Sequence, residues 1–217
     1  MRHTSFVLGV ILGLCLAAVP ADASEPGWTI RVFAAGFDPD LDVVVPAENP
    51  DFVRVTAESD IGFGGSLEYG FGGLLGLELG FFTANPDITL SAEDIPGYGD
   101  LSLTDSLSTT ATTFDLNFHL TPGSESFDVS LGAGLAYLSY GNLSYAEPDG
   151  DTLTLTTDND LGYSVKAGLG ISLGKNGNWA AIGGLRYIWS DLEATQEDTA
   201  TFDFDTFSFT VGIAYSF

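Results

Sequence analysis

The final segment of the chain, Phe207 to Phe217, alternates strictly between apolar and small side chains. A period of two predicts a β-strand with one apolar face and one small, mostly polar face. Such a strand suits a membrane β-barrel, whose outer face contacts lipid and whose inner face lines a crowded lumen. An edge strand of a soluble sandwich has the same alternation, so the rest of the chain must separate the two classes. The apolar face consists of Phe207, Phe209, Val211, Ile213, Tyr215 and Phe217.

Residues 1–23 have the composition of a secretory signal peptide. Arg2 and His3 supply a short positive region, residues 6–19 are apolar, and Ala21-Asp22-Ala23 forms a small-x-small cleavage site. The apolar stretch is shorter than the roughly 20 residues that a membrane-spanning helix needs. We therefore expect cleavage after Ala23, with residues 24–217 as the mature chain. Cys15 is the only cysteine, so the mature chain offers no disulfide and no cysteine nucleophile.

The charge of the chain is strongly negative and unevenly distributed. The formal net charge is −24, although 45% of the residues are hydrophobic. The apolar content excludes an acidic disordered chain, and the negative charge disfavours nucleic acid as a partner. After residue 23 no apolar run reaches the length of a transmembrane helix, so a membrane would have to be crossed by strands. The acids gather in residues 38–58, 87–105, 147–160 and 191–205, which predicts exposed loops.

Between the acidic segments, period-two alternation predicts eight strands. Their lengths of about 9–12 residues match a tilted membrane strand. Short connections rich in Gly, Ser and Asn, at 70–73, 121–126 and 172–178, alternate with the four long acidic ones. This asymmetry is typical of outer-membrane barrels with both termini on the periplasmic side. The predicted strands are Trp28–Phe37, Asp60–Tyr69, Leu74–Phe82, Thr109–Leu120, Phe127–Tyr137, Leu161–Ile171, Trp179–Trp189 and Thr206–Phe217.

Aromatic residues near the strand ends complete the prediction of fold class. Trp28, Tyr69 and Trp179 lie at the periplasmic level with the terminal aromatics, and Tyr163 and Trp189 lie at the outer level with Tyr137 and Tyr187. Two aromatic girdles are expected of a membrane barrel, whereas a soluble sandwich has no use for them. The sequence therefore predicts an all-β fold, an eight-stranded antiparallel transmembrane β-barrel with short periplasmic turns and long acidic extracellular loops.

The opposite, inward-facing rows carry charges among many Gly, Ser and Ala residues. Ions in so narrow an interior must pair to offset desolvation, which predicts an ion-pair network that holds the barrel together. The alternative is a polar constriction below an apolar vestibule formed by Phe33, Phe37, Phe82 and Ile188 near the outer ends. Sequence leaves both open. The expected lumen network consists of Arg31, Glu68, Glu78, Asp115, Asp128, Lys166 and Arg186.

Catalytic, metal and cofactor sites are not expected. His119 is the only histidine of the mature chain, and Asp115 shares its face. The predicted strand direction places His119 at the periplasmic end, whereas barrel enzymes usually keep their active sites toward the outside. Paired acids such as Asp38-Pro-Asp40-Leu-Asp42 lack the glycine and terminal glutamate of an EF-hand loop. We expect a histidine with satisfied hydrogen bonds, in the lumen or near the turn, and no enzyme activity, no metal and no cofactor.

Several segments together resemble the OmpW family of small outer-membrane barrels. They are Trp28-Thr-Ile-Arg31 with Phe37-Asp-Pro39, Ser130 to Tyr137, Gly162 to Gly170, Trp179 to Ile188, and Val211 to Phe217. The resemblance implies an eight-stranded barrel with a mostly apolar channel for small hydrophobic molecules. Two departures concern Asn85-Pro86-Asp87-Ile88, which lacks the family's histidine, and Asp205-Thr206-Phe207, which lacks its proline.

Two functions follow as hypotheses. The first is a channel of the bacterial outer membrane for passive uptake of small, hydrophobic molecules, in contact with outer-membrane lipids and lipopolysaccharide. The second is a structural or adhesive barrel that acts through its extracellular loops and resembles the OmpX or opacity-protein group. In both, Tyr215 and Phe217 resemble the C-terminal signal that the barrel-assembly machinery recognises.

Overall fold

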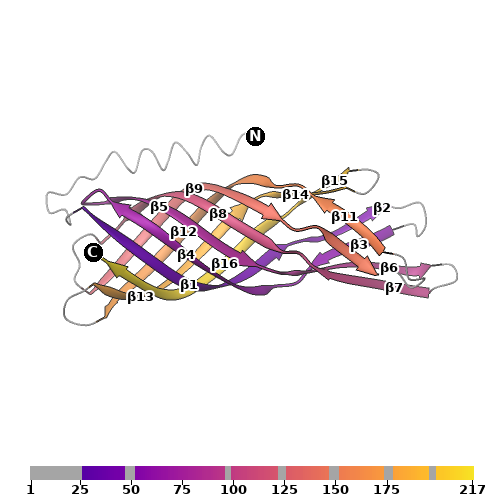
Figure 1. The fold of residues 1–217 in the computed structure, drawn as a ribbon, viewed down its shortest axis with the longest axis horizontal. Coiled ribbons are helices and arrows are strands. Elements are labelled where there is room, and N and C mark those ends of the chain that lie inside the picture. The colour runs from indigo at the N-terminus through magenta and orange to yellow at the C-terminus, as the bar shows by residue number, and fades with distance from the viewer. Residues whose placement is uncertain are drawn as a thin grey trace.

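The computed structural model describes residues 26–46, 52–95, 99–121, 126–146, 152–173, 178–195 and 199–217, so the expected signal peptide lies outside the described residues. Eight long strands form a closed antiparallel barrel (Figure 1), which confirms the predicted fold class. In spatial order they are β1 (Gly27–Asp40), β16 (Asp205–Ser216), β13 (Trp179–Trp189), β12 (Asp160–Leu173), β9 (Phe127–Tyr140), β8 (Thr109–His119), β5 (Leu75–Ala84) and β4 (Asp60–Gly70). Among these residues, no helix is long and apolar enough to cross a membrane.

The first and last strands close the barrel. β1 and β16 pair from Thr29 opposite Ser216 to Asp40 opposite Asp205. At the end of this ladder, the Trp28 backbone N–H donates to the Phe217 carbonyl at 3.2 Å, and the Phe217 N–H donates to the Trp28 carbonyl at 3.0 Å. Closure leaves no unpaired strand edge, which a membrane requires because lipid cannot hydrogen-bond the backbone.

Apolar side chains cover the outer face of the barrel. Phe63 is 67% exposed and Val211 54%, and comparable residues follow on the other strands. An exposed apolar band of this extent belongs in lipid. At the end that carries the C-terminus, Trp28 packs on Tyr69 with ring centroids 4.8 Å apart, and Trp179 packs on Tyr215 at 4.9 Å. Tyr187 packs on Trp189 at 4.8 Å toward the other end, so aromatics lie at both levels.

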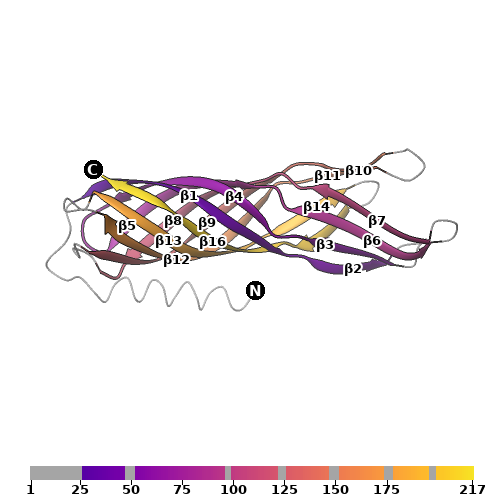
Figure 2. The same cartoon turned by 90° about the horizontal axis from the view of Figure 1, so that it is seen from below.

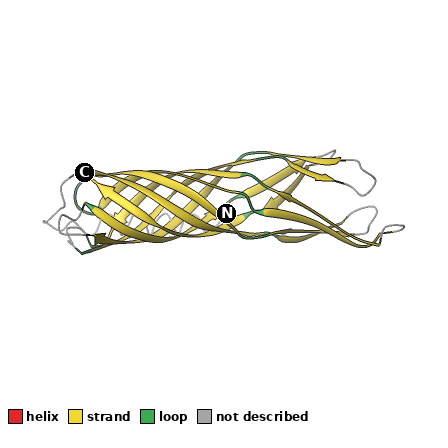
Figure 3. Ribbon diagram, turned by 60° about the horizontal axis from the view of Figure 1, so that its bottom comes forward, coloured by secondary structure: helices red, strands yellow, loops and turns green. Residues whose placement is uncertain are grey.

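The acidic segments differ from the loops expected of them, because they contain strands. β2 (Asp42–Pro46), β3 (Phe52–Ala57), β6 (Asp87–Ile95) and β7 (Gly99–Ser106) form one four-stranded sheet. β10 (Leu143–Ala146), β11 (Thr152–Thr157), β14 (Asp191–Thr195) and β15 (Thr199–Asp203) form a second. The two sheets project beyond the barrel (Figures 2 and 3), and we call them together the cap.

Every barrel strand is interrupted where it continues into the cap. The interruptions fall at residues 41, 58–59, 85–86, 107–108, 141–142, 158–159, 190 and 204, a ring that we call the waist. Carboxylates accept hydrogen bonds from backbone N–H groups there: Asp60 from Asn85 at 2.6 Å, and Asp160 from Asp191 at 2.9 Å. Some of the acids thus satisfy backbone donors at the waist.

An apolar core fills the outer half of the barrel and the space between the two cap sheets. Phe37, Leu138 and Ile188 come from the barrel, Ile88 and Tyr145 from the cap, and all are buried. Leu107 and Phe204 belong to the waist and are fully buried in the same cluster. The Tyr145 hydroxyl donates to the Ile88 carbonyl at 3.4 Å and so joins the two sheets. We refer to this continuous cluster as the apolar core.

Candidate functional site

The lumen is divided along the barrel axis. On the outer side, the inward residues Ala136, Leu138 and Ile188 are fully buried in the apolar core. On the periplasmic side, inward residues such as Ser130 and Ile182 are partly exposed. Charged side chains cross the lumen in between. The interior is thus sealed toward the outside by packed apolar side chains and is accessible from the periplasmic side as far as the charges.

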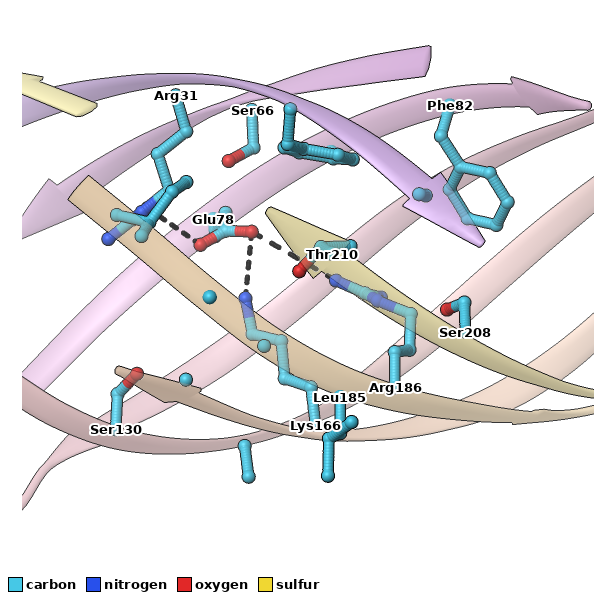
Figure 4. Close-up of a pocket in the computed structure, with 18 of the residues that line it drawn as sticks. Arg31, Ser66, Glu78, Phe82, Ser130, Lys166, Leu185, Arg186, Ser208 and Thr210 are labelled. Carbon is cyan, nitrogen blue, oxygen red and sulfur yellow. Dashed lines mark hydrogen bonds and ion pairs between the residues drawn. The ribbon is translucent and has the colours of Figure 1, made fainter. Parts of the chain in front are cut away.

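Glu78 lies at the centre of these charges (Figure 4). Its carboxylate accepts a hydrogen bond from Arg31 Nη1 at 2.8 Å and contacts Lys166 Nζ at 2.7 Å. Arg31 Nη2 also contacts Glu68 at 2.8 Å. These residues come from β1, β4, β5 and β12, so the contacts join opposite sides of the wall. Pairing offsets the desolvation of each buried ion.

Arg186 and Asp115 form a second, two-pronged ion pair. Arg186 Nη2 lies 2.8 Å from Asp115 Oδ2, and Nη1 lies 3.3 Å from Oδ1. The Ser164 hydroxyl donates to Asp115 Oδ1 at 2.8 Å, and Lys166 Nζ lies 3.7 Å from Oδ2. Asp115 is 0% exposed. A fully buried carboxylate with this many donors depends on all of them, because none can be replaced by water.

His119 and Asn117 join the same network. The sequence analysis expected hydrogen-bond partners for His119, but it did not include either residue in the network. His119 Nε2 lies 2.6 Å from Glu68, and Nδ1 lies 3.0 Å from Asp128, the last of the charged residues expected in the lumen. The Asn117 amide donates to both Glu68 and Glu78, at 2.6 and 3.0 Å. Asn117 and His119 follow Asp115 at every second position of the same strand, so all three face the lumen. This alternation was the signal in the sequence that could have placed them there. Both ring nitrogens of His119 face carboxylates, so neither is directed at a hydroxyl nucleophile.

Inward glycines make room for the network rather than for an open pore. A Cβ at Gly132 would lie 2.5 Å from Asn117 Oδ1 and 2.7 Å from Lys166 Cε. A Cβ at Gly76 would collide with the Glu68 carboxylate. Gly134 lies against the Phe114 carbonyl of the next strand. The small residues thus allow long charged side chains and neighbouring strands to approach closely.

The four residues expected to line an apolar vestibule occupy the outer side of the lumen. Phe37, Phe82 and Ile188 are buried in the apolar core, and the rings of Phe37 and Phe82 are 5.9 Å apart. Phe33 is partly buried and packs against the same core. These side chains therefore pack within or against one apolar cluster, in the region where the sequence analysis left an apolar vestibule open as an alternative.

Outside the membrane-spanning strands, charged groups are mostly exposed. Arg54 donates to both oxygens of Asp42, at 2.7 and 2.6 Å, and these hydrogen bonds lower the pKa of Asp42. Partial burial and the neighbouring carboxylates of Asp160 and Asp203 raise the pKa of Asp191. Within the described ranges, no group of three or more His, Cys, Asp or Glu side chains is arranged to hold a metal ion.

Comparisons with known proteins agree with this architecture. The model of the outer membrane protein beta-barrel domain family matches residues 6–217. The crystal structure of OprG from Pseudomonas aeruginosa is similar, with a TM-score of 0.65 and 18% identity, over 89% of this chain and 96% of that one. The solid-state NMR structure of AlkL in DMPC bilayers has a TM-score of 0.57 and 17% identity, over 92% and 94%. No curated protein sequence matches significantly.

A third solved structure is also similar in fold. Ail, the attachment invasion locus protein of Yersinia pestis, in complex with the heparin analogue sucrose octasulfate, has a TM-score of 0.50 and 13% identity, over 89% of this chain and all of that one. At identities this low, these likenesses concern the fold alone. None of these three proteins is named as an enzyme.

Proposed function

We propose that this chain, which belongs to the outer membrane protein beta-barrel domain family, mediates passive uptake of small apolar molecules. It is an outer-membrane barrel of the kind that its resemblance to OmpW implied. The apolar core carries this proposal. It runs without interruption from between the cap sheets, through the waist, into the outer half of the barrel. A surface-exposed cap with such an interior offers an apolar solute an environment from which water is excluded.

The energetics favour apolar over polar solutes. Each methylene that moves from water into an apolar interior gains about 0.8 kcal/mol, whereas a buried polar group without a partner loses free energy. Admission requires the packed side chains to part. At the waist the regular strand ladders are interrupted, and individual backbone hydrogen bonds such as that from the Phe204 N–H to the Ser190 carbonyl, at 2.8 Å, hold the chain there.

Flux into liposomes tests the proposal. Purified protein reconstituted in liposomes should accelerate entry of a neutral hydrophobic fluorescent probe, relative to protein-free liposomes, and leave entry of a sugar of similar size unchanged. The selectivity follows from the apolar core on the outer side of the ion network. Equal acceleration of both solutes, or of neither, would contradict the proposal.

The second candidate function is adhesion or a structural role through the cap. The ordered sheets favour it, because eight cap strands present a defined surface beyond the barrel. Deleting residues 87–106, a range that includes β6 and β7, separates the candidates if the variant still inserts. Loss of surface binding then supports adhesion, whereas loss of probe entry alone supports uptake. An acidic cap disfavours polyanionic partners of the heparin type, because like charges repel.

We propose further that the protein has no enzymatic role. Its other partners would be the lipids of the outer membrane and the machinery that assembles outer-membrane barrels. The exposed apolar band would contact lipids and lipopolysaccharide, and the terminal aromatics Tyr215 and Phe217 would be read by the barrel-assembly machinery. Tyr215 and Phe217 stack with ring centroids 6.0 Å apart at the periplasmic end.

Removal of Phe217 should strongly reduce insertion into the outer membrane. The residue also exchanges two backbone hydrogen bonds with Trp28, so barrel closure is weakened together with recognition. The amount of heat-modifiable barrel in the outer-membrane fraction measures the effect. Replacing exposed Glu93 in the cap with Gln serves as the control and should leave insertion unchanged. Equal insertion of both variants would argue against the terminal signal.

A further inference from the structure

We propose that the lumen cavity beside Glu78 binds the carboxylate of a small monocarboxylate that carries an apolar chain. This names a substrate class for the proposed uptake function and rests on that function. The cavity has a volume of about 100 Å³ and lies among side chains from all eight barrel strands. Figure 4 shows Glu78 between Arg31 on one side and Lys166 and Arg186 on the other, with Phe82 to the right of these charges.

The wall of the cavity is rich in cations. Arg31, Lys166 and Arg186 all line it, although the whole sequence has only six Lys and Arg against thirty Asp and Glu. Two carboxylates line it as well: Glu78, which the cations share, and Asp128, which contacts His119. The cations are also paired behind the wall, Arg31 with Glu68 and Arg186 with Asp115, each at 2.8 Å, so a ligand carboxylate could bind them only by displacing an internal carboxylate.

Ser66 provides an independent observation. Its side chain lines the same cavity, is 8% exposed, and has no hydrogen-bond partner for its hydroxyl among the described residues. Ser66 lies directly opposite Arg31 in the β1–β4 register. A buried hydroxyl without a partner costs free energy, which a ligand oxygen beside Arg31 would recover.

Glu78 indicates how a ligand carboxylate would be held. One carboxylate already receives Arg31 at 2.8 Å and Lys166 at 2.7 Å, with Arg186 at 4.0 Å. A ligand carboxylate in the cavity would compete with Glu78 for these cations and accept the hydrogen bond of Ser66. Phe33 and Phe82 line the cavity and also pack in or against the apolar core, so the apolar chain would extend toward them. A neutral hydrocarbon would leave Ser66 unpaired.

Binding of hexanoate and of hexan-1-ol, each labelled with ¹³C at position 1, tests the proposal by NMR titration of the protein in zwitterionic nanodiscs. Hexanoate should bind the wild type. Glu78→Gln should bind it about tenfold more tightly, because Arg31 and Lys166 lose their internal carboxylate, and Lys166→Met about tenfold more weakly, which is the scale of one charge-assisted hydrogen bond. Arg54→Met removes an exposed cation of the cap and should change nothing. Hexan-1-ol should bind all four proteins equally.

Two results would overturn the proposal: hexanoate affinities that follow those of hexan-1-ol across the variants, or no tightening in Glu78→Gln. If Glu78→Gln does not show the heat-dependent gel shift of a folded barrel, Ser66→Ala replaces it and should weaken hexanoate binding alone. Equal hexanoate binding by Ser66→Ala and wild type would then overturn it. Entry of the neutral probe without these hexanoate effects would refute only this inference, and the hexanoate effects without probe entry would refute only the uptake function.

Discussion

Replacing Arg186 with Met should lower the free energy of unfolding by about 3–5 kcal/mol, the usual cost of removing one partner from a buried ion pair. Asp115 is fully buried and takes both prongs of the Arg186 guanidinium. After the substitution, Asp115 keeps Ser164 and the more distant Lys166. These two donors do not compensate a carboxylate that water cannot reach, so most of the cost should be observed.

The matched control is the neighbouring, lipid-facing residue. Leu185→Met conserves volume on the outer face of the same strand and should cost less than about 1.5 kcal/mol. Reversible urea unfolding in lipid vesicles measures both variants. Equal stability of Arg186→Met and Leu185→Met would mean that the pair with Asp115 does not contribute to stability.

Replacing Phe204 with Ala should cost about 3–5 kcal/mol, because a large side chain is removed from a packed core. Phe204 lies at the waist, is 0% exposed, and makes an edge contact with Tyr140 at 5.6 Å. The space left behind lies within the apolar core. Entry of the neutral probe into liposomes should therefore become faster while the barrel becomes less stable.

Phe209→Ala provides the comparison for this prediction. Phe209 is on the strand that follows Phe204 and is 52% exposed on the lipid face. Lipid chains can occupy the space it leaves, so the loss of stability should be smaller and probe entry should stay at the wild-type rate. If Phe204→Ala slowed probe entry, or left both stability and entry unchanged, the waist would not belong to the path of apolar solutes.

The barrel could be predicted from the sequence because a membrane strand leaves a strong two-residue pattern. In β16, lipid faces one row and the lumen the other, so the side chains from Phe207 to Ala214 alternate between more exposed and more buried positions. The same parity assigned Arg31, Lys166 and Arg186 to the lumen together with the carboxylates they contact. Alternation along a strand shows which face a residue lies on, but it does not show how far along the barrel axis the side chain lies. It could not say that Arg186 would contact Asp115 while Lys166 would contact Glu78.

The cap could not be predicted because its strands are short and acids hide their alternation. β14 reads Asp-Leu-Glu-Ala-Thr, in which Leu192 and Ala194 are buried while Asp191 and Glu193 are exposed. In sequence, such a segment is indistinguishable from a solvated loop. The packing of the apolar core was missed for a related reason. Alternation indicated that Phe37 and Ile188 face inward, but only the cap that covers them makes that region a packed interior.

The most direct test of the uptake proposal is whether a small apolar molecule enters the apolar core. Isoleucine methyl groups labelled with ¹³C report on this, because Ile88 and Ile188 are buried in the core while Ile61 and Ile213 face lipid. In nanodiscs, a small hydrocarbon carrying a nitroxide should broaden the signals of all four residues. A polar nitroxide of similar size should leave Ile88 and Ile188 sharp. Broadening of Ile61 and Ile213 alone by the hydrocarbon would show that apolar molecules stay in the bilayer and would contradict uptake through this interior.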